Sequence, residues 1–148
     1  PRPPPRRLAP HAPLAASVGS DLLVDIDVTD LVADANSSDA VVAIKARNGD
    51  GDWRGVLTAT PRHRSVLLQL IPGPHPPTHE HPGGEEVFVI HEGTAEFDFG
   101  AGDLHMVGPG SVLYASAGQQ HTFTVLGSDP LLMMCFLSVN EPDDTVER

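Results

Sequence analysis

The chain has 148 residues, a length that fits one domain with one hydrophobic core. Its 9 basic residues stand against 20 acidic ones, and a formal net charge of -11 disfavours binding to DNA or RNA, because both are polyanions. No apolar run approaches the length of about 20 residues that a membrane-spanning helix needs. The sequence has one cysteine, Cys135, which cannot form an internal disulfide. This favours a reducing compartment, and we expect a soluble cytoplasmic protein.

Residues 1–19 are rich in Pro, Arg and Ala and lack any periodic pattern, so we expect a flexible arm followed by a single domain over residues 20–148. In that domain, short runs rich in Val, Ile, Leu, Phe and Thr are separated by Gly, Pro, Asn and Asp. Only residues 29–39 have a helical pattern. The predicted strands are residues 22–28, 40–46, 55–60, 65–71, 86–91, 94–99, 105–107, 111–115, 121–126 and 131–139. Many short strands with such turns predict an all-β sandwich or barrel.

Metal-binding side chains gather between the fourth and fifth predicted strands. In an extended segment alternate side chains share a face, so His79 and His81 point the same way and Glu80 points the opposite way. Two imidazoles in this arrangement can bind one ion. The Pro-Gly-Gly turn that follows lets the next strand return a carboxylate to the same ion. That carboxylate belongs to Glu85 or Glu86, of which only one can face inward, because adjacent strand residues face opposite sides.

A second block lies further along the chain, where a tight turn around Gly118 places an isolated histidine, His121, at the start of a predicted strand. At this point the sequence resembles the cupin superfamily. The first cupin motif is matched at every position, by Gly73, His79, His81, Glu86 and Gly93. The second motif is matched by Gly110, Gly118 and His121, whereas Ser116 and Val125 stand where the family usually has Pro and Asn.

The resemblance covers about residues 64–138 and implies an antiparallel jelly-roll β-barrel with one divalent metal ion inside. It implies that His79, His81, Glu86 and His121 hold this ion, and the motif spacing favours Glu86 over Glu85. Three imidazoles and one carboxylate suit Fe, Mn, Ni, Cu or Zn, and the ligand set alone does not choose among them.

Several further residues are candidates for a substrate pocket. If Glu86 faces inward, Phe88 and Ile90 face inward too, and Phe123 lies on the same side as His121. Two polar residues complete the candidate pocket. Gln69 could face inward and hydrogen-bond a substrate, with a plain barrel-wall position as the alternative. His75 could lie at the rim of the pocket, with a solvated loop position as the alternative.

The resemblance implies an enzyme, a mononuclear non-heme metal oxidoreductase of the dioxygenase type, acting on a small organic substrate that coordinates the ion. One alternative is an isomerase, decarboxylase or lyase that uses the ion as a Lewis acid. Another is a non-catalytic cupin that senses a metal or a small molecule. A barrel whose metal merely stabilises the fold is a third alternative. By analogy with other cupins of this size we expect a homodimer, with the predicted strand at residues 22–28 as an edge strand available to the partner.

Overall fold

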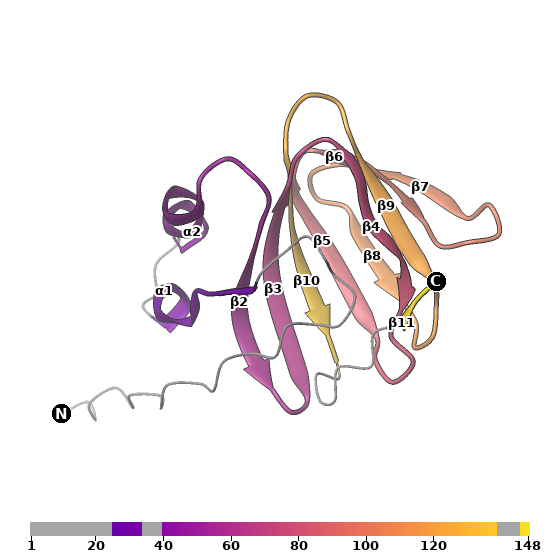
Figure 1. The fold of residues 1–148 in the computed structure, drawn as a ribbon, viewed down its shortest axis with the longest axis horizontal. Coiled ribbons are helices and arrows are strands. Elements are labelled where there is room, and N and C mark those ends of the chain that lie inside the picture. Colours follow the sequence, from indigo (N-terminus) through magenta and orange to yellow (C-terminus); the bar gives the residue numbers. More distant parts are fainter. Residues whose placement is uncertain (1–24, 34–39, 139–145) are drawn as a thin grey trace.

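We describe a computed structural model of the chain, which places residues 25–33, 40–138 and 146–148. Two β-sheets pack against each other, and two short helices lie at one side of the molecule beside β2 (Figure 1). The elements are β1 (Asp25–Asp27), α1 (Thr29–Ala33), α2 (Ala40–Asn48), β2 (Trp53–Thr60), β3 (His63–Leu70), β4 (Gly73–Glu80), β5 (Glu86–Glu92), β6 (Thr94–Asp98), β7 (Leu104–Val107), β8 (Val112–Ala115), β9 (His121–Leu126), β10 (Leu131–Leu137) and β11 (Val146–Glu147).

The first sheet has six strands in the order β1-β2-β3-β10-β5-β8, and the second has five strands in the order β11-β4-β9-β6-β7. The ladders are antiparallel except for the short parallel pair of β1 and β2. Strands far apart in sequence, such as β4 and β9, become neighbours because the chain crosses between the sheets, as in a jelly roll. The predicted all-β jelly-roll fold is confirmed, although the sheets stay separate and do not close into one continuous barrel.

Alternating side chains fill the space between the two sheets, which we call the interior. In β9, Phe123 and Val125 are buried in the interior, and in β5 the same is true of Phe88 and Ile90. The residues between them are less buried, as expected for strands with one face on the core. The interior is therefore largely apolar, and the polar side chains that enter it are exceptions.

A second, smaller core lies on the outer face of the six-stranded sheet. There Val28 and Ile44, from the helical side of the molecule, pack on Trp53, Leu67 and Leu132. This core covers part of the outer face of β2, β3 and β10 and anchors the helices. None of the helices in the described residues is long and apolar enough to cross a membrane.

The predicted strand at residues 40–46 is wrong, because these residues form the first part of α2. Val41 and Ile44 are three positions apart and both pack toward the smaller core, whereas Val42 is 66% exposed. Spacing of three residues fits one face of a helix and does not fit a strand. The β-branched residues of this segment therefore serve helix packing, which overrides their preference for strands.

Other differences concern strand ends. The strand predicted at residues 22–28 is present only as β1, and its first three residues lie outside the described part of the chain, as does the predicted arm at residues 1–19. The structure adds β4 and β11, which the strand pattern did not predict. Three of the eight residues of β4 are prolines, and proline is rare in strands because it lacks a backbone N–H.

The last glycine of the first motif has a steric role. Gly93 joins β5 to β6 with a φ of 81°, in the left-handed region that favours glycine. A Cβ atom at this position would lie 2.4 Å from the carbonyl oxygen of Pro130. The close approach of the two turns therefore requires a residue without a side chain.

Candidate metal centre

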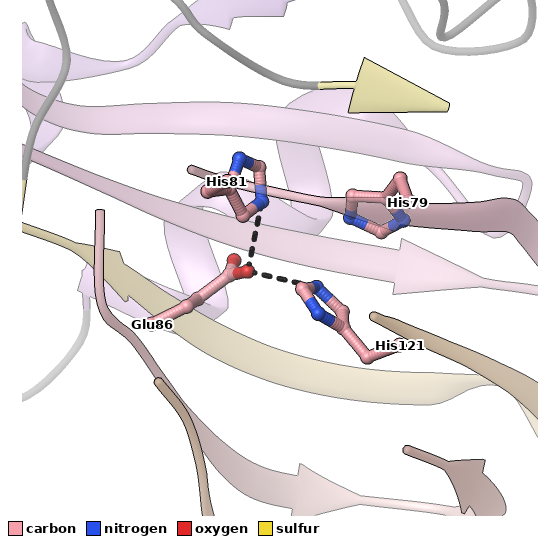
Figure 2. A group of neighbouring side chains, drawn as sticks. All are labelled: His79, His81, Glu86 and His121. Carbon is pink, nitrogen blue, oxygen red and sulfur yellow. Dashed lines mark ion pairs between the residues drawn. The ribbon is translucent and has the colours of Figure 1, made fainter. Parts of the chain in front are cut away.

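Four side chains from three strands meet at one end of the interior (Figure 2). His79 lies in β4, His81 follows directly after it, and Glu86 and His121 begin β5 and β9. Each offers one ligand atom, and these four atoms lie within 4.8 Å of one another. The ring centroids of His79 and His121 are 4.2 Å apart, and that of His81 is 5.1 Å from the first and 5.5 Å from the second. The cluster could bind a metal ion.

The backbone brings these side chains together in two ways. His79 and His121 are directly paired in the antiparallel ladder of β4 and β9, so their side chains share a face. The carbonyl of His81 accepts hydrogen bonds from the N–H groups of Gly84, at 3.2 Å, and Gly118, at 2.9 Å. The two motif turns are therefore joined at His81.

The turn before His121 forms although Ser116 replaces the usual proline. The Ser116 carbonyl accepts a hydrogen bond from the Gln119 N–H at 2.9 Å, and the Gln119 side-chain oxygen accepts one from the Ser116 N–H at 3.0 Å. Gly118 has a φ of 73°, which a turn of this kind requires. Reciprocal hydrogen bonds thus hold the turn that a proline would otherwise stiffen.

Hydrogen bonds to the backbone fix the tautomers of two imidazoles. Nδ1 of His79 lies 3.0 Å from the carbonyl oxygen of Pro77, and Nδ1 of His121 lies 3.0 Å from that of Gln119. A carbonyl can only accept, so each Nδ1 must donate and carry the proton. In the neutral imidazole, Nε2 is then left with a lone pair, as in a metal ligand.

Two buried polar atoms at the centre of the cluster have no hydrogen-bond partner. Nε2 of His121 and Oε2 of Glu86 are 3.1 Å apart, and both are buried without a hydrogen-bond partner. Nε2 of His81 is also 3.1 Å from the same oxygen, and Figure 2 shows both approaches. A carboxylate and an unprotonated nitrogen are both acceptors and do not stabilise each other. A divalent cation between them would satisfy both, so the residues present fit a metal ion.

The electrostatic state of the site also suits a cation. Burial and, to a lesser extent, the nearby His121 lower the pKa of His79 to about 4, so His79 is neutral at pH 7. Burial acts to raise the pKa of Glu86, whereas His121 and His81, when protonated, lower it to about 2, so Glu86 is charged at neutral pH. The centre therefore offers one negative charge and neutral imidazole nitrogen, without a proton to displace from either residue.

Aromatic rings surround the cluster on the interior side. The ring centroid of His121 is 5.4 Å from that of Phe88 and 6.4 Å from that of Phe99. Behind them, Phe97 stacks on Phe123 at 4.7 Å. As the strand parity predicted, Phe88, Phe123 and also Ile90 face the interior, where they belong to the main core. Any substrate role for these three residues stays a prediction.

The structure distinguishes Glu86 from its neighbours. Glu85 is exposed and accepts a hydrogen bond from the Tyr114 hydroxyl at 2.7 Å, on the outside of the sheet. Glu80 points away from the cluster and pairs with Arg148 at 2.7 Å. Among the three glutamates considered, Glu86 is the one that joins the histidines.

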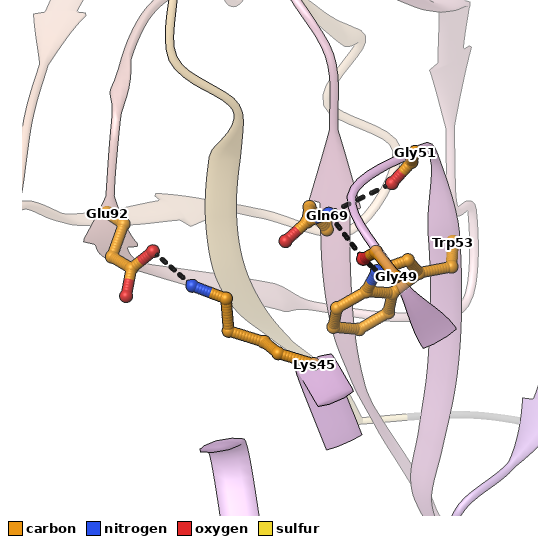
Figure 3. Close-up of polar contacts among 6 residues, drawn as sticks. All are labelled: Lys45, Gly49, Gly51, Trp53, Gln69 and Glu92. Atoms are coloured by element: carbon orange, nitrogen blue, oxygen red, sulfur yellow. Dashed lines mark hydrogen bonds and ion pairs between the residues drawn. The ribbon is translucent and has the colours of Figure 1, made fainter. Parts of the chain in front are cut away.

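Gln69 does not face the interior, and this position corrects the expectation that it lines a pocket. Its side-chain amide donates hydrogen bonds to the carbonyls of Gly49 and Gly51, both at 3.0 Å (Figure 3). It is paired in the ladder with Trp53, which belongs to the smaller core on the outer face. The polar group of Gln69 is thus used to hold the turn between α2 and β2.

His75 lies in β4 and not in a loop. It is half-buried, pairs in the ladder with Phe123, and its Nε2 lies 3.0 Å from the carbonyl oxygen of Ile71. It does not join the four-residue cluster. A position at the rim of a pocket remains a prediction for this residue.

Phe97 and Phe99 are neighbours of the site that were not among the candidates from the sequence. Both lie on the inward parity of β6 and the turn after it, and alternation with Ala95 could have indicated them. The carbonyls of Pro77 and Gln119 were not candidates either. No sequence pattern reveals a backbone carbonyl as a hydrogen-bond partner, so these contacts required the structure.

Comparison with known proteins adds a family match. The family model of the cupin domain matches residues 66–137. No curated protein sequence matches the chain.

Solved structures resemble the chain over most of its length. An uncharacterized conserved protein with a double-stranded beta-helix domain from Klebsiella pneumoniae aligns over 68% of this chain and 85% of its own, with 24% identity and a TM-score of 0.60. The DMSP lyase DddQ from Ruegeria pomeroyi aligns over 78% of this chain and 66% of its own, with 19% identity and a TM-score of 0.58. A cupin-like protein from Thermotoga maritima aligns over 66% of this chain and 75% of its own, with 14% identity and a TM-score of 0.60. At these identities the likeness establishes the fold.

Proposed function

This chain belongs to the cupin superfamily, and from that premise we propose that it is a metal-dependent enzyme acting on a small organic molecule that coordinates the ion. The proposal is carried by one observation, the buried atoms Glu86 Oε2 and His121 Nε2, which face each other at 3.1 Å and have no hydrogen-bond partner. Leaving such a pair unsatisfied lowers stability, so a ligand is the simplest reason for it.

We assign the binding of one divalent ion, Fe, Mn, Ni, Cu or Zn, to His79, His81, Glu86 and His121. When bound, such an ion supplies a Lewis acid or a redox centre with coordination positions left for a substrate. The backbone hydrogen bonds from Nδ1 of His79 and His121 keep the Nε2 lone pairs directed at the ion. The role of the protein residues is to fix this geometry and to exclude water.

The reaction that we favour is oxidation of the dioxygenase type. Apart from the two other histidines of the cluster, the rings that the structure places near His121 are those of Phe88 and Phe99, and phenyl rings can neither donate nor accept a proton. Such a wall suits chemistry in which the substrate and oxygen meet at the metal, and it does not suit a step that depends on a protein acid or base. It would also hold the apolar part of a substrate against the ion.

A lyase is the second candidate, because a histidine stands near the same wall. His105, in the edge strand β7, is paired in the ladder with Phe97 and shares its face of the sheet, with 48% of its side chain exposed. Its ring is 5.6 Å from that of Phe99, and its Nε2 is 2.8 Å from the Asp103 carboxylate. A carboxylate that orients an imidazole is a common arrangement for proton transfer. The similarity to a DMSP lyase agrees with this alternative.

The test begins with metal content, measured by elemental analysis of the protein loaded separately with Fe(II), Mn(II), Ni(II), Cu(II) and Zn(II). We expect about one ion per chain in the wild type and loss of the ion in His79→Ala. The matched control is His91→Ala, since His91 is exposed in β5 and outside the cluster. A wild type that binds none of these ions would exclude the proposal.

Measurements of O₂ uptake then distinguish the dioxygenase from the lyase. The probes are small molecules that can bind a metal through two oxygen atoms, such as catechol and acetylacetone. Oxygen consumption by the Fe(II), Mn(II), Ni(II) or Cu(II) protein, unchanged in His105→Ala, supports the dioxygenase. Product formation without oxygen, retained with Zn(II) and lost in His105→Ala, supports the lyase. Binding of these probes without turnover would favour the sensing cupin.

Dimer formation remains a proposal. β1 is the edge strand of the six-stranded sheet, where a second copy could add its own strand. Analytical ultracentrifugation tests this, and a monomer at all concentrations would exclude it.

A further inference from the structure

The strand β4, which contains His79 and leads to His81, is weakly held by its own ladder. β4 contains Pro74, Pro76 and Pro77, which have no N–H to donate. Its pairing with β9 is interrupted after His75 and resumes at His79. Near the ligands, that side of β4 contacts β9 through the ladder pair of His79 and His121 and through the Thr122 hydroxyl, which donates to the Pro76 carbonyl at 2.6 Å. Just beyond the strand, the Gly118 N–H donates to the His81 carbonyl at 2.9 Å.

The other side of β4 is completed by β11. In this short ladder Glu147 pairs with His79 and Val146 pairs with Glu80. The N–H of Arg148 donates a hydrogen bond to the carbonyl of Thr78 at 2.7 Å. His79 therefore has a neighbouring strand on both sides, and β11 takes the place of an open edge next to the metal site.

A charged pair closes this contact. Nη2 of Arg148 donates to Oε1 of Glu80 at 2.7 Å, and only 12% of the Glu80 side chain is exposed, against 53% for Arg148. A carboxylate with so little access to water needs a partner of this kind.

We propose that the ion pair of Glu80 and Arg148 positions His79 and His81 for metal binding. Glu80 stands between the two histidines and points to the opposite face of the strand. A strand that rolls about its own axis would move all three side chains together. Holding Glu80 from outside therefore fixes both imidazoles inside, and both residues of the pair act as positioning residues. This inference rests on the proposed metal binding.

The test measures the dissociation constants of Zn²⁺ and Co²⁺ for the full chain and its Glu80→Gln and Arg148→Gln variants. We expect each variant to bind about 10-fold to 100-fold more weakly, the range found when a residue that orients a ligand is lost. The absorption spectrum of bound Co²⁺ should change as well, because it reports the geometry around the ion. The charge-swapped double variant, Glu80→Arg with Arg148→Glu, should recover much of the affinity.

A matched control separates positioning from general stability. Lys45 and Glu92 form an ion pair at the same 2.7 Å distance, which joins α2 to the end of β5 away from the cluster (Figure 3). Glu92→Gln should leave the metal affinity and the Co²⁺ spectrum unchanged. The thermal unfolding of each metal-free variant is recorded first, so that affinities are compared only among folded proteins. Arg148→Gln, at the more exposed position, supplies the comparison if Glu80→Gln does not fold.

The outcomes are distinct. Wild-type affinity and an unchanged spectrum in both single variants would overturn this inference while leaving the metal site intact. Weaker binding with no recovery in the charge-swapped variant would also overturn it, since the loss would not come from the pairing. A wild type that binds neither ion would remove the proposed function itself, and this inference with it.

Discussion

Two of the places where the described part of this molecule buries polar atoms treat those atoms in opposite ways. On the outer face of the six-stranded sheet, the Gln69 amide and the Trp53 indole N–H donate to backbone carbonyls at 3.0 Å (Figure 3). At the candidate metal centre, His121 Nε2 and Glu86 Oε2 face each other as two acceptors. The first arrangement is complete in itself, whereas the second is complete only with a cation.

The difference separates structural polar groups from functional ones. Satisfied buried hydrogen bonds hold a turn and stabilise the fold. Unsatisfied ones lower the stability of the metal-free protein and persist where another requirement maintains them. Residue type alone does not make this distinction, because a buried glutamine and a buried histidine are both plausible pocket residues.

The largest effect is expected when the candidate metal centre loses one of its ligand atoms. His121→Ala should reduce metal content from about one ion per chain to near zero, because it removes an Nε2 that faces the centre. Elemental analysis after loading measures this directly. Retention of a full equivalent of metal would show that the acceptor pair is not the binding site.

Acid should destabilise the metal-free protein through the same cluster. His79 has a pKa of about 4 in the folded chain and 6.5 otherwise, so the unfolded state binds more protons as the pH falls from 6.5 to 4. The free energy of unfolding should therefore drop over that range, by at most about 3 kcal/mol. Urea unfolding at several pH values should show a shallower loss between pH 6.5 and 4 in His79→Gln, and equal slopes would contradict this.

Gln69, whose amide nitrogen donates two hydrogen bonds, should affect stability and leave metal binding unchanged. Gln69→Met keeps the side-chain volume but removes the hydrogen bonds to the carbonyls of Gly49 and Gly51. The free energy of unfolding should fall by about 1–3 kcal/mol, the cost of leaving buried acceptors unsatisfied. Metal content should stay as in the wild type. Urea unfolding and elemental analysis on the same sample check both parts, and a loss of metal would place Gln69 in the functional group after all.

The smallest expected effect is a change in the free energy of unfolding, and its sign is the informative part. Glu86→Gln replaces one acceptor by an amide that can donate to a histidine Nε2. In the metal-free protein the free energy of unfolding should rise by about 0.5–1.5 kcal/mol, although metal binding is lost. Urea unfolding of chelator-treated protein gives the value. A variant less stable than the wild type would mean that the Glu86 carboxylate is already satisfied.

Much of the metal centre could be predicted from the sequence because its pattern is local. His79, His81 and Glu86 lie in one turn and its flanking strands, where alternation puts His79 and His81 on one face and the motif spacing selects Glu86 over Glu85. Phe88 and Ile90 follow by the same rule. His121 required the family resemblance, since nothing in its own surroundings links it to the first motif.

Other features depend on contacts between distant segments. The face of Gln69 is set by its register with Trp53, and the sequence does not specify register across strands. Residues 40–46 have β-branched side chains, yet packing of Ile44 on the outer core makes them helical. β11 is two residues long and is defined only by its pairing with β4. Arg148 could therefore not be connected with the metal site before the structure.

The positions of the four candidate ligand residues along the chain also determine the order in which they come together during folding. His79, His81 and Glu86 can approach one another as soon as one turn forms, a local event with a low entropic cost of closure. His121 arrives only when β9 pairs with β4, after the segments that form β6, β7 and β8. During refolding, capture of the ion by three donors would thus come early and full affinity would come late. Metal affinity would then report how far the pairing of β4 with β9 has advanced.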